Sequence, residues 1–289
     1  MVVSGPGRSM MIIVDRPGPL TTIQDLGRPG LAHLGVSPSG AADRTAHRLA
    51  NRLVGNPESR ATLETTLGGL TLTAADLVWV AVTGSPTGLL INGRPGSSHC
   101  PFALSEGDRL VIQPPAQGVR NYLAVRGGIK IAKTLGSRST DLLSGLGPAP
   151  LEPGQQLRVG HTRQRMPDVD QAPPNEPRKV LAVRPGPRRD WFTDSAWAEF
   201  LQTTWTATAD GNRVAVRLDG PRLTRRITAE LPSEGLIRGA VQVPASGLPL
   251  IFLADHPVTG GYPVIAVLTD RSADHAAQLR PGDQVRFGL

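Results

Sequence analysis

The sequence predicts a mainly β protein made of two related β domains with short helices. Glycine and proline are frequent, with 33 and 27 of the 289 residues, while aromatic residues make up only 4%. This composition is typical of many short strands joined by tight turns. Apolar residues make up 39% of the chain, which is enough for one large or two medium cores. An approximate internal duplication favours two domains.

The duplication consists of three short segments that return in the same order in the second half of the chain. Each half opens with a strand that ends in Arg-Pro-Gly, continues to a Ser-Gly loop, and closes on a Pro-Gly turn before a strand. One such pair can arise by chance, but the shared order indicates related domains. The pairs are VDRPGP at 14–19 with AVRPGP at 182–187, GVSPSG at 35–40 with QVPASG at 242–247, and EPGQQLRVG at 152–160 with RPGDQVRFG at 280–288.

A polar, proline-bearing stretch at 161–178 separates the two copies. It shows no hydrophobic periodicity, so we interpret it as a linker. The sequence therefore predicts an N-terminal domain at 1–160 and a C-terminal domain at 179–289.

Within the first copy, three stretches at 69–84, 108–115 and 121–128 have the apolar, β-branched character of strands. The sequence EGD at 106–108 predicts a turn that opens a strand, as does PGD at 281–283 in the second copy.

Two segments are predicted to be helices. The first, at 41–56, has apolar residues at helical spacing, with Ser39 as a candidate cap and a Gly-Asn-Pro stop. The second, at 189–202, places several large apolar residues on one face. The expected buried faces are Ala46, Leu49, Ala50, Leu53 and Val54 in the first helix, and Trp191, Phe192, Ala196 and Phe200 in the second.

Composition also excludes several classes of protein. The net charge is +7, but the cations are nearly all arginine and form no basic run interleaved with aromatic residues, so nucleic acid is not an expected partner. No stretch of about 18 apolar residues predicts a membrane span, and the first ten residues lack a signal-peptide core. Cys100 is the one cysteine, which fits a reducing compartment. We expect a cytoplasmic protein with neither a nucleic-acid nor a membrane partner.

The sequence carries no standard catalytic signature. It has no phosphate-binding loop, no Gly-x-Ser-x-Gly elbow and no His-Glu-x-x-His metal motif. His99 and Cys100 are adjacent but lack the spacing of a zinc site, so no metal ligands are predicted.

Two polar loops of the first copy nonetheless offer ligand-binding groups. In TTIQDLGRPG at 21–30, Asp25 and Arg28 lie among glycines, and an arginine can grip a carboxylate or phosphate. They can equally hold each other in a turn. In GVSPSGAADR at 35–44, Ser39 and Gly40 precede the expected helix, where amides favour an anion, although ordinary capping is the commoner use.

A third loop, at 125–147, contains GSRST. Arg138, Ser139 and Thr140 there combine a guanidinium, two hydroxyls and backbone amides, which can cradle an oxyanion. A solvated Ser/Thr turn is the alternative for the hydroxyls.

The fourth loop lies between two apolar segments in LADHPVTGGYPVIAVLTD at 253–270. Its polar residues can provide acid–base and hydrogen-bonding groups, and its glycines let a substrate approach the backbone. A hairpin turn with a rim tyrosine is the alternative. The candidates are Asp255, His256, Thr259, Gly260, Gly261 and Tyr262.

Taken in order, the motifs of the chain resemble one family. They are GPLTTIQDLGRPG, GVSPSGAADRTAHRLANRLVGN, ATLETTLGG, YLAVRGGI, LGSRST, GAVQVPASGLPLIFLADHPVTGGYP and QLRPGDQVRF. This ordered set is similar to that of the C subunit of bacterial 5-oxoprolinase, a family also called allophanate hydrolase subunit 2 or biotin-dependent carboxyltransferase, which includes the KipA proteins. The resemblance extends from about residue 11 to residue 289.

The resemblance implies two cyclophilin-like β-barrel domains and an ATP-dependent hydrolase that opens 5-oxoproline to glutamate. It implies two protein partners, a KipI-like protein (allophanate hydrolase subunit 1) and a LamB/YcsF-type protein, with a small amide or ureide as substrate. ATP with magnesium is expected at a site shared with the KipI-like partner, because this chain shows no phosphate loop. No covalent biotin is expected, because no Ala-Met-Lys-Met occurs.

The family motifs match the positions of the candidate residues, and the chemistry of each side chain suggests a role for it. Arg28 and Arg138 would hold a carboxylate or phosphate, Ser139 and Thr140 would donate hydrogen bonds, and Asp255 or His256 would handle a proton or a metal-bound nucleotide. Tyr262 and Gln242 would orient the substrate. The chain departs from the family at Pro257 and Val258, where Gln and Thr are expected, and at 212–220, where an Arg-Met-Gly run is expected.

Two other functions stay open on the sequence. One is a carboxyltransferase component that acts with a separate biotin carrier on urea- or allophanate-type substrates. The other is a KipA-type regulator that binds a KipI-like kinase inhibitor without catalysis.

Overall fold

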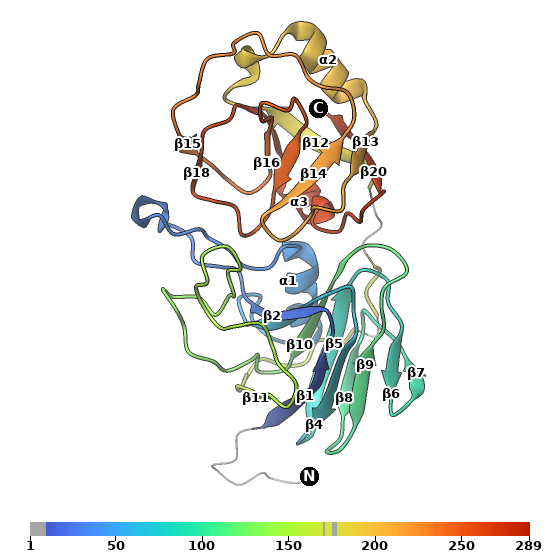
Figure 1. Ribbon diagram of the computed structural model, residues 1–289. Coiled ribbons are helices and arrows are strands. Elements are labelled where there is room, and N and C mark those ends of the chain that lie inside the picture. Colours follow the sequence, from blue (N-terminus) through green and yellow to red (C-terminus); the bar gives the residue numbers. More distant parts are fainter. Residues whose placement is uncertain (1–9, 170, 175–177) are drawn as a thin grey trace. The chain divides into compact units, whose positions relative to one another are not determined.

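The computed structural model describes residues 10–169, 171–174 and 178–289 (Figure 1). Parts of the predicted linker, residues 170 and 175–177, therefore lie outside the described residues. None of the helices in the described ranges is long and apolar enough to span a membrane.

The chain forms two compact units, and each is built from more than one stretch of sequence. Unit 1 takes its described residues from Met1–Gly27, Arg44–Thr140 and Leu146–Asn175. Unit 2 takes its described residues from Arg28–Asp43, Asp141–Gly145 and Glu176–Leu289. This division differs from the simple predicted boundary at 161–178, because two short segments of the first half belong to unit 2.

Unit 1 contains two antiparallel sheets of six and five strands among the described residues. The first has the order β11-β1-β4-β9-β6-β7 and the second the order β2-β3-β10-β5-β8. The strands of the first sheet are β1 (Met11–Pro17), β4 (Leu70–Ala74), β6 (Leu89–Ile91), β7 (Arg94–Gly96), β9 (Arg109–Ile112) and β11 (Gln156–Arg158). Those of the second are β2 (Leu20–Gln24), β3 (Thr62–Thr66), β5 (Val78–Gly84), β8 (Pro101–Leu104) and β10 (Arg120–Val125).

The core of unit 1 lies between these sheets. Ile12 and Leu72 from the first sheet share one buried cluster with Leu63 and Leu123 from the second. Burial of this apolar surface is the main stabilising contribution to such a two-layer arrangement.

Helix α1 (Arg44–Leu53) packs on β5 and β10 of unit 1. Four of the five predicted face residues are buried, and Leu49 is half-buried. The buried face also carries two polar residues, His47 and Asn51. The helix begins at Arg44, five residues after Ser39, so the predicted capping role of Ser39 is wrong.

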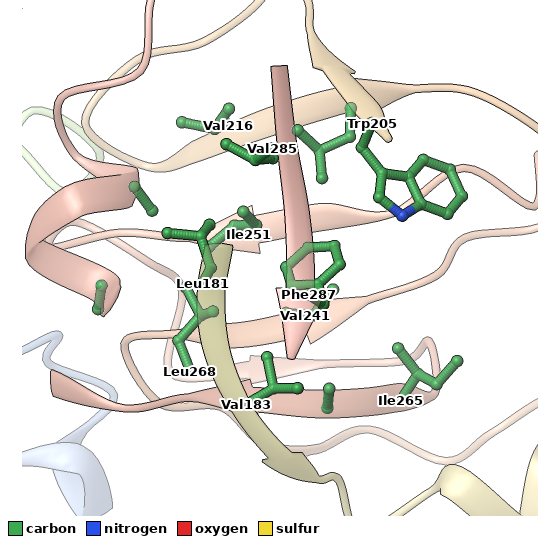
Figure 2. Close-up of a cluster of buried hydrophobic side chains, with 14 of the residues drawn as sticks. Leu181, Val183, Trp205, Val216, Val241, Ile251, Ile265, Leu268, Val285 and Phe287 are labelled. Atoms are coloured by element: carbon green, nitrogen blue, oxygen red, sulfur yellow. The ribbon is translucent and has the colours of Figure 1, made fainter. Parts of the chain in front are cut away.

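Unit 2 is a closed barrel of seven strands, in the order β12-β19-β16-β17-β14-β13-β20. Neighbouring strands are antiparallel except for β12 and β20, which run parallel and close the ring. Figure 2 shows the apolar side chains that fill it, including Leu181, Val241 and Phe287. The strands are β12 (Val180–Pro185), β13 (Trp205–Ala207), β14 (Ala215–Asp219), β16 (Ala240–Gln242), β17 (Leu250–Phe252), β19 (Val264–Leu268) and β20 (Gln284–Gly288).

Short helices complete unit 2. Helix α2 (Asp194–Gln202) follows the short helix η2 (Arg189–Trp191) and is capped by the Thr193 hydroxyl. Phe192, Ala196 and Phe200 are buried as predicted. Helix α3 (Asp270–Ala276), capped by Thr269, was not predicted from the sequence. The remaining elements are η1 (Ala32–Leu34) and the ribbon of β15 (Glu234–Gly235) with β18 (Thr259–Gly260).

The mainly β fold with few, short helices confirms the predicted fold class. The duplicated segments occupy related positions, since the first and last strands pair in each unit. However, β1 and β11 pair antiparallel, whereas β12 and β20 pair parallel. The internal repeat therefore does not extend to the relative direction of the first and last strands of each unit.

Candidate functional site

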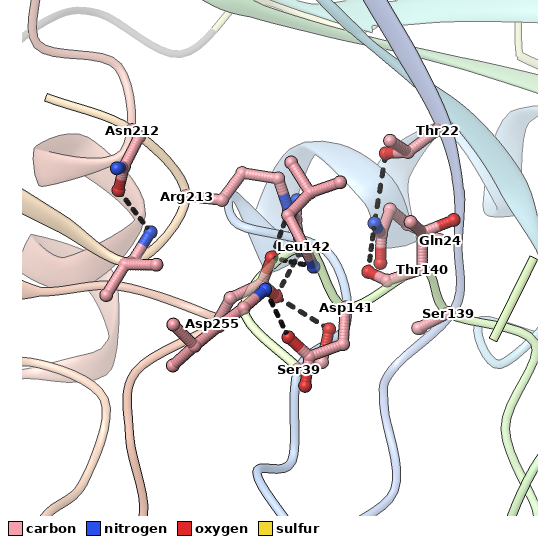
Figure 3. A network of polar contacts seen from close by, with 12 residues as sticks. Thr22, Gln24, Ser39, Ser139, Thr140, Asp141, Leu142, Asn212, Arg213 and Asp255 are labelled. Atoms are coloured by element: carbon pink, nitrogen blue, oxygen red, sulfur yellow. Dashed lines mark hydrogen bonds and ion pairs between the residues drawn. The ribbon is translucent and has the colours of Figure 1, made fainter. Parts of the chain in front are cut away.

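Asp255 is the centre of a highly connected polar group in unit 2 (Figure 3). Its Oδ2 accepts a bond from Arg213 Nε at 2.9 Å, and its Oδ1 accepts one from Arg213 Nη2 at 2.9 Å. Ser39 Oγ donates to Oδ1 at 2.7 Å, and the Leu142 N–H donates to Oδ2 at 3.1 Å. Four donors from three distant stretches of sequence thus meet on one buried carboxylate. We call these residues the Asp255 cluster.

Backbone pairing brings Arg213 opposite Asp255. Beyond β17 the chain continues alongside the residues that precede β14, where the Leu253 N–H donates to Val214 O and the Asp255 N–H donates to Arg213 O, at 2.8 and 3.0 Å. Both ionic side chains are almost fully buried, so the bidentate geometry compensates for the loss of water.

The segment that contains Ser39 is held by two arginines. Arg213 Nη2 also donates to Gly40 O, and Arg238 Nη2 donates to Ala42 O, each at 2.7 Å. Arg238 is itself paired with Asp274 at 2.6 Å. Ser39 has a φ of 51°, which is uncommon outside glycine and is maintained only where surrounding contacts fix it.

This geometry favours a positioning role for Asp255. A carboxylate has about four acceptor positions, and the four hydrogen bonds described above occupy them. Ser39, Gly40 and Asp255, which the sequence offered as candidates in separate loops, are therefore brought together in a scaffold that fixes the loop at 39–42.

A second group in unit 2 surrounds the sequence GGYP. Gln242 Nε2 donates to Tyr262 O at 2.7 Å, so the end of β16 holds the loop that follows β18. At Gly260, an added Cβ would lie 2.9 Å from Gln242 Nε2 and 2.8 Å from Leu236 Cδ1. The glycine thus allows the close approach, while Tyr262 stays 47% exposed.

The other candidates of unit 2 lie in varied surroundings. His256 is buried, with Nδ1 2.8 Å from Pro257 O. Because a carbonyl only accepts, Nδ1 carries the proton in this contact. Thr259 is exposed and pairs with Gly235, while Gly261 is half-buried. Arg28 is buried and its N–H donates to Pro38 O at 2.8 Å.

The third group lies in unit 1 and centres on Asp25. Ser137 Oγ and Ser139 Oγ donate to Asp25 Oδ1 at 2.6 and 2.7 Å, and the Arg138 N–H donates to Oδ2 at 2.7 Å. The Gly27 N–H adds a fourth bond, at 2.8 Å. Backbone amides and hydroxyls thus surround this carboxylate and tie it to the GSRST loop.

Arg138 and Thr140 extend from the same loop. Arg138 Nε donates to Ile131 O at 2.8 Å, and its side chain is half-buried. The Thr140 hydroxyl donates to Pro148 O at 2.9 Å, and Thr140 O accepts a bond from Gln24 Nε2, also at 2.9 Å (Figure 3). These contacts fix the loop around Asp25 from both sides.

Sequence reasoning missed two residues that organise these groups, Arg213 and Ser137. Arg213 lies in the segment 212–220, which departs from the Arg-Met-Gly run expected for the family but keeps an arginine. That departure was the sequence signal that could have drawn attention to Arg213. Ser137 lies in the GSRST motif, next to the three residues that were chosen as candidates.

Among the described residues, no three His, Cys, Asp or Glu side chains gather in a group suited to a metal ion. Cys100 Sγ donates to Ser97 O at 3.3 Å, and burial raises the pKa of its thiol, which disfavours the thiolate.

Comparisons with known proteins agree with this architecture. The family model described as "Carboxyltransferase domain, subdomain A and B" matches residues 34–289. The chain is 35% identical over 280 residues to the 5-oxoprolinase C subunit of Escherichia coli K12, covering 96% of this chain and 90% of that protein.

Two solved structures are similar over nearly the whole chain. The structure of TTHA0988 has a TM-score of 0.89 at 33% identity and covers 99% of this chain. That of the K. lactis urea amidolyase also has a TM-score of 0.89, at 29% identity, and covers 98%. The chain spans 57% of the TTHA0988 chain and 19% of the urea amidolyase chain. By the family match and these likenesses, this chain belongs to the family of carboxyltransferase domains with subdomains A and B.

Proposed function

We propose that this chain is the C subunit of an ATP-dependent 5-oxoprolinase, which converts 5-oxo-L-proline to L-glutamate. The observation that carries the proposal is the likeness to the E. coli protein of that name, at 35% identity over 90% of its length. The match to urea amidolyase, by contrast, covers only 19% of a larger chain.

The chemistry of the reaction suits the groups described above. Opening a lactam places developing negative charge on the amide oxygen, and prearranged donors stabilise that charge. In unit 2 the loop at 260–262 offers half-buried backbone held by Gln242 and an exposed tyrosine. The Asp255 cluster gives the segment at 39–42 a fixed geometry, which reduces the cost of ordering a binding surface.

The partners belong to the same proposal. A KipI-like protein and a LamB/YcsF-type protein would complete the enzyme. ATP with its magnesium would be held at a site shared with the KipI-like partner.

Reconstitution tests this function. The chain is mixed with its KipI-like and LamB/YcsF-type partners, and glutamate formation from 5-oxo-L-proline with ATP is measured, with each protein omitted in turn. We expect activity only in the complete mixture. A folded, associated mixture that forms no glutamate would contradict the proposal.

Carboxyl transfer is the second candidate, favoured by the family match and by the likeness to the urea amidolyase. It predicts that the chain, with its KipI-like partner and a carboxylated biotin carrier, moves the carboxyl group to urea or a related ureide. Release of label from ¹⁴C-carboxybiotin that depends on urea would support this function over the first.

A further inference from the structure

Asn92 and Gly93 form the two-residue turn that joins β6 to β7 in unit 1. The strand register places Ile91 opposite Arg94. Both turn residues have a positive φ, 50° at Asn92 and 79° at Gly93. These values are typical of the type I′ hairpin turn, for which Asn-Gly is a preferred sequence. Both residues are exposed, so the turn is open to water.

An asparagine that is followed by glycine is chemically labile, because glycine has no side chain to hinder attack by its own nitrogen. That nitrogen forms a bond to the asparagine Cγ and closes a five-membered imide. The Cγ–Nδ2 bond breaks, and the proton of the attacking nitrogen leaves with the ammonia. Water then opens one of the two imide C–N bonds and gives aspartate or isoaspartate. Asn92 is the one asparagine of the sequence that precedes a glycine.

In the folded protein the Asn92 amide is held by two hydrogen bonds at the start of β9. Its Oδ1 accepts a bond from the Arg109 N–H at 2.8 Å, and its Nδ2 donates to Asp108 Oδ1 at 2.7 Å. A main-chain donor and a carboxylate acceptor together fix which amide atom is oxygen and which is nitrogen. Ring closure turns the amide carbon toward the Gly93 nitrogen, a movement that both bonds oppose.

Asp108 is itself fixed by the turn that precedes β9. Its Oδ2 accepts a bond from the Ser105 N–H at 2.7 Å, and its carbonyl accepts one from the Ala74 N–H at 2.9 Å. The hydrogen bond from the Asn92 side chain, and after it that from the Ser105 N–H, lowers the pKa of Asp108. The carboxylate is therefore ionised at neutral pH. A hydrogen bond to an ionised group is roughly twice as strong as one between neutral groups.

The products of the reaction do not fit this arrangement. Aspartate at position 92 places an oxygen where the amide nitrogen now lies, 2.7 Å from Asp108 Oδ1. Two carboxylates that close repel each other. Isoaspartate adds a carbon to the main chain and disturbs the register of β6 with β7. Either product weakens the outermost hairpin of the six-stranded sheet, in which β7 is an edge strand (Figure 1).

We propose that Asn92-Gly93 is a site of spontaneous deamidation in this chain, and that Asp108 and the Arg109 N–H protect it in the folded state. The reaction consumes only water and needs no enzyme. Its rate follows the small population of molecules in which the turn has opened. The site goes beyond the proposed function, since this hairpin carries none of the candidate substrate-binding residues.

Timed incubation of the whole chain tests this site. The protein is kept in mildly alkaline buffer, either folded or in concentrated guanidinium chloride, and peptide mapping by mass spectrometry measures the converted fraction of each asparagine. The variants are Asp108→Ala, Asp108→Asn and Asn92→Gln. The matched control is Glu106→Ala, which removes an exposed carboxylate from the same turn. Circular dichroism establishes that each variant is folded.

In the denatured chain we expect Asn92 to be converted faster than any other asparagine. Folding should slow its conversion at least about tenfold, as for the hydrogen bonds that must open. Folded Asp108→Ala should recover most of that factor, and Asp108→Asn, which keeps an acceptor oxygen but loses the charge, should recover less. Glu106→Ala should react like the unmodified chain, and Asn92→Gln should show no conversion at this position.

Faster conversion of another asparagine in the denatured chain would overturn the site. Equal rates at Asn92 in the folded and the denatured chain would overturn its protection by the fold. A folded Asp108→Ala protein that reacts no faster than the unmodified chain would remove the role of Asp108. If Asp108→Ala does not fold, the Asp108→Asn protein decides the same point, because its rate must still exceed that of the unmodified chain.

Discussion

The ion pair between Arg213 and Asp255 is nearly inaccessible to water. This burial determines how the removal of one or both partners would change the stability of the protein. A buried pair contributes little net stability compared with apolar residues of the same shape. Loss of one partner, however, leaves the other charge buried without compensation. The Arg213–Asp255 pair therefore fixes the positions of the segments that contain Ser39 and Leu142, because each segment donates a hydrogen bond to the Asp255 carboxylate.

Asp255→Asn is expected to lower the free energy of unfolding by about 3–5 kcal/mol, because it removes the charge that compensates the buried Arg213 cation. Urea-induced unfolding measures the change. The control is Asp219→Asn, an exposed residue at the end of β14, which should change stability by less than about 0.5 kcal/mol. A fully stable Asp255→Asn protein that has lost activity would instead favour the catalytic role predicted from the sequence.

His47 gives a second testable effect. Burial lowers its pKa from 6.5 to about 4, although a hydrogen bond to Glu58 O partly opposes the shift. The unfolded chain therefore binds a proton at a higher pH than the folded chain does. Stability from neutral His47 is fully present above pH 6.5 and is lost as the pH falls toward 4.

The expected slope from this residue is about 1.4 kcal/mol per pH unit between pH 6.5 and 4. It is measured as the difference in pH-dependent urea unfolding between the unmodified chain and His47→Gln. His33→Gln, which changes an exposed histidine, should keep the full slope. Identical slopes for the unmodified chain and His47→Gln would refute the assignment.

At the scale of the elements, the two strands that end in Arg-Pro-Gly show why a glycine recurs at this position in both units. An added Cβ at Gly18 would lie 2.3 Å from Gly68 O, and one at Gly186 would lie 2.3 Å from Val264 O. In both units a backbone carbonyl passes directly against the glycine that follows the first strand. Only glycine allows this approach, since a backbone atom cannot move aside as a side chain can.

Gly186→Ala should therefore destabilise unit 2 by at least about 1–3 kcal/mol through overpacking. Gly235→Ala is the matched control, because an added Cβ there meets nothing within 4 Å and its φ is not positive. Thermal unfolding compares them. Equal midpoints for the two variants would show that the carbonyl of Val264 can relax.

Elements with a clear apolar period were predictable, and those defined by long-range pairing were not. The strands within 69–84 and the face of α1 follow from local pattern alone. The seven-residue helix α3 carries too few turns to show a period. The parallel pairing of β12 with β20 joins distant parts of the chain, such as Val180 and Arg286, which no local signal specifies.

The same limit applies to the site. Ser39 and Asp255 were predictable as candidates because polar residues among glycines stand out. Their common partner Arg213 lies 42 residues from Asp255 in sequence and was found only through the fold.

For the whole molecule, the main feature is that unit 2 is discontinuous. Its barrel strands all lie within 180–288, yet Ala42 belongs to its core, and Ser39 and Leu142 bind its Asp255. The domain boundary that the sequence predicts at 161–178 would separate the barrel from these residues.

A fragment of residues 179–289 is therefore expected to unfold without cooperativity or to aggregate, since it exposes apolar core and leaves Asp255 with half of its donors. Addition of a peptide of residues 28–43 should raise its unfolding midpoint as the peptide concentration rises. Calorimetry measures both. A fragment that unfolds cooperatively at the midpoint of the full chain, unaffected by peptide, would show that the two segments are dispensable.

The interleaved segments also determine the order in which the protein can fold during synthesis. Residues 28–43 emerge from the ribosome well before the barrel that buries Ala42, and strand β20, which closes that barrel, is the last of the seven to emerge. At a translation rate of about 5–20 residues per second, this segment waits on the order of ten seconds or more for its partner. We therefore expect nascent chains to depend on a chaperone, and a slow final step when β20 docks beside β12.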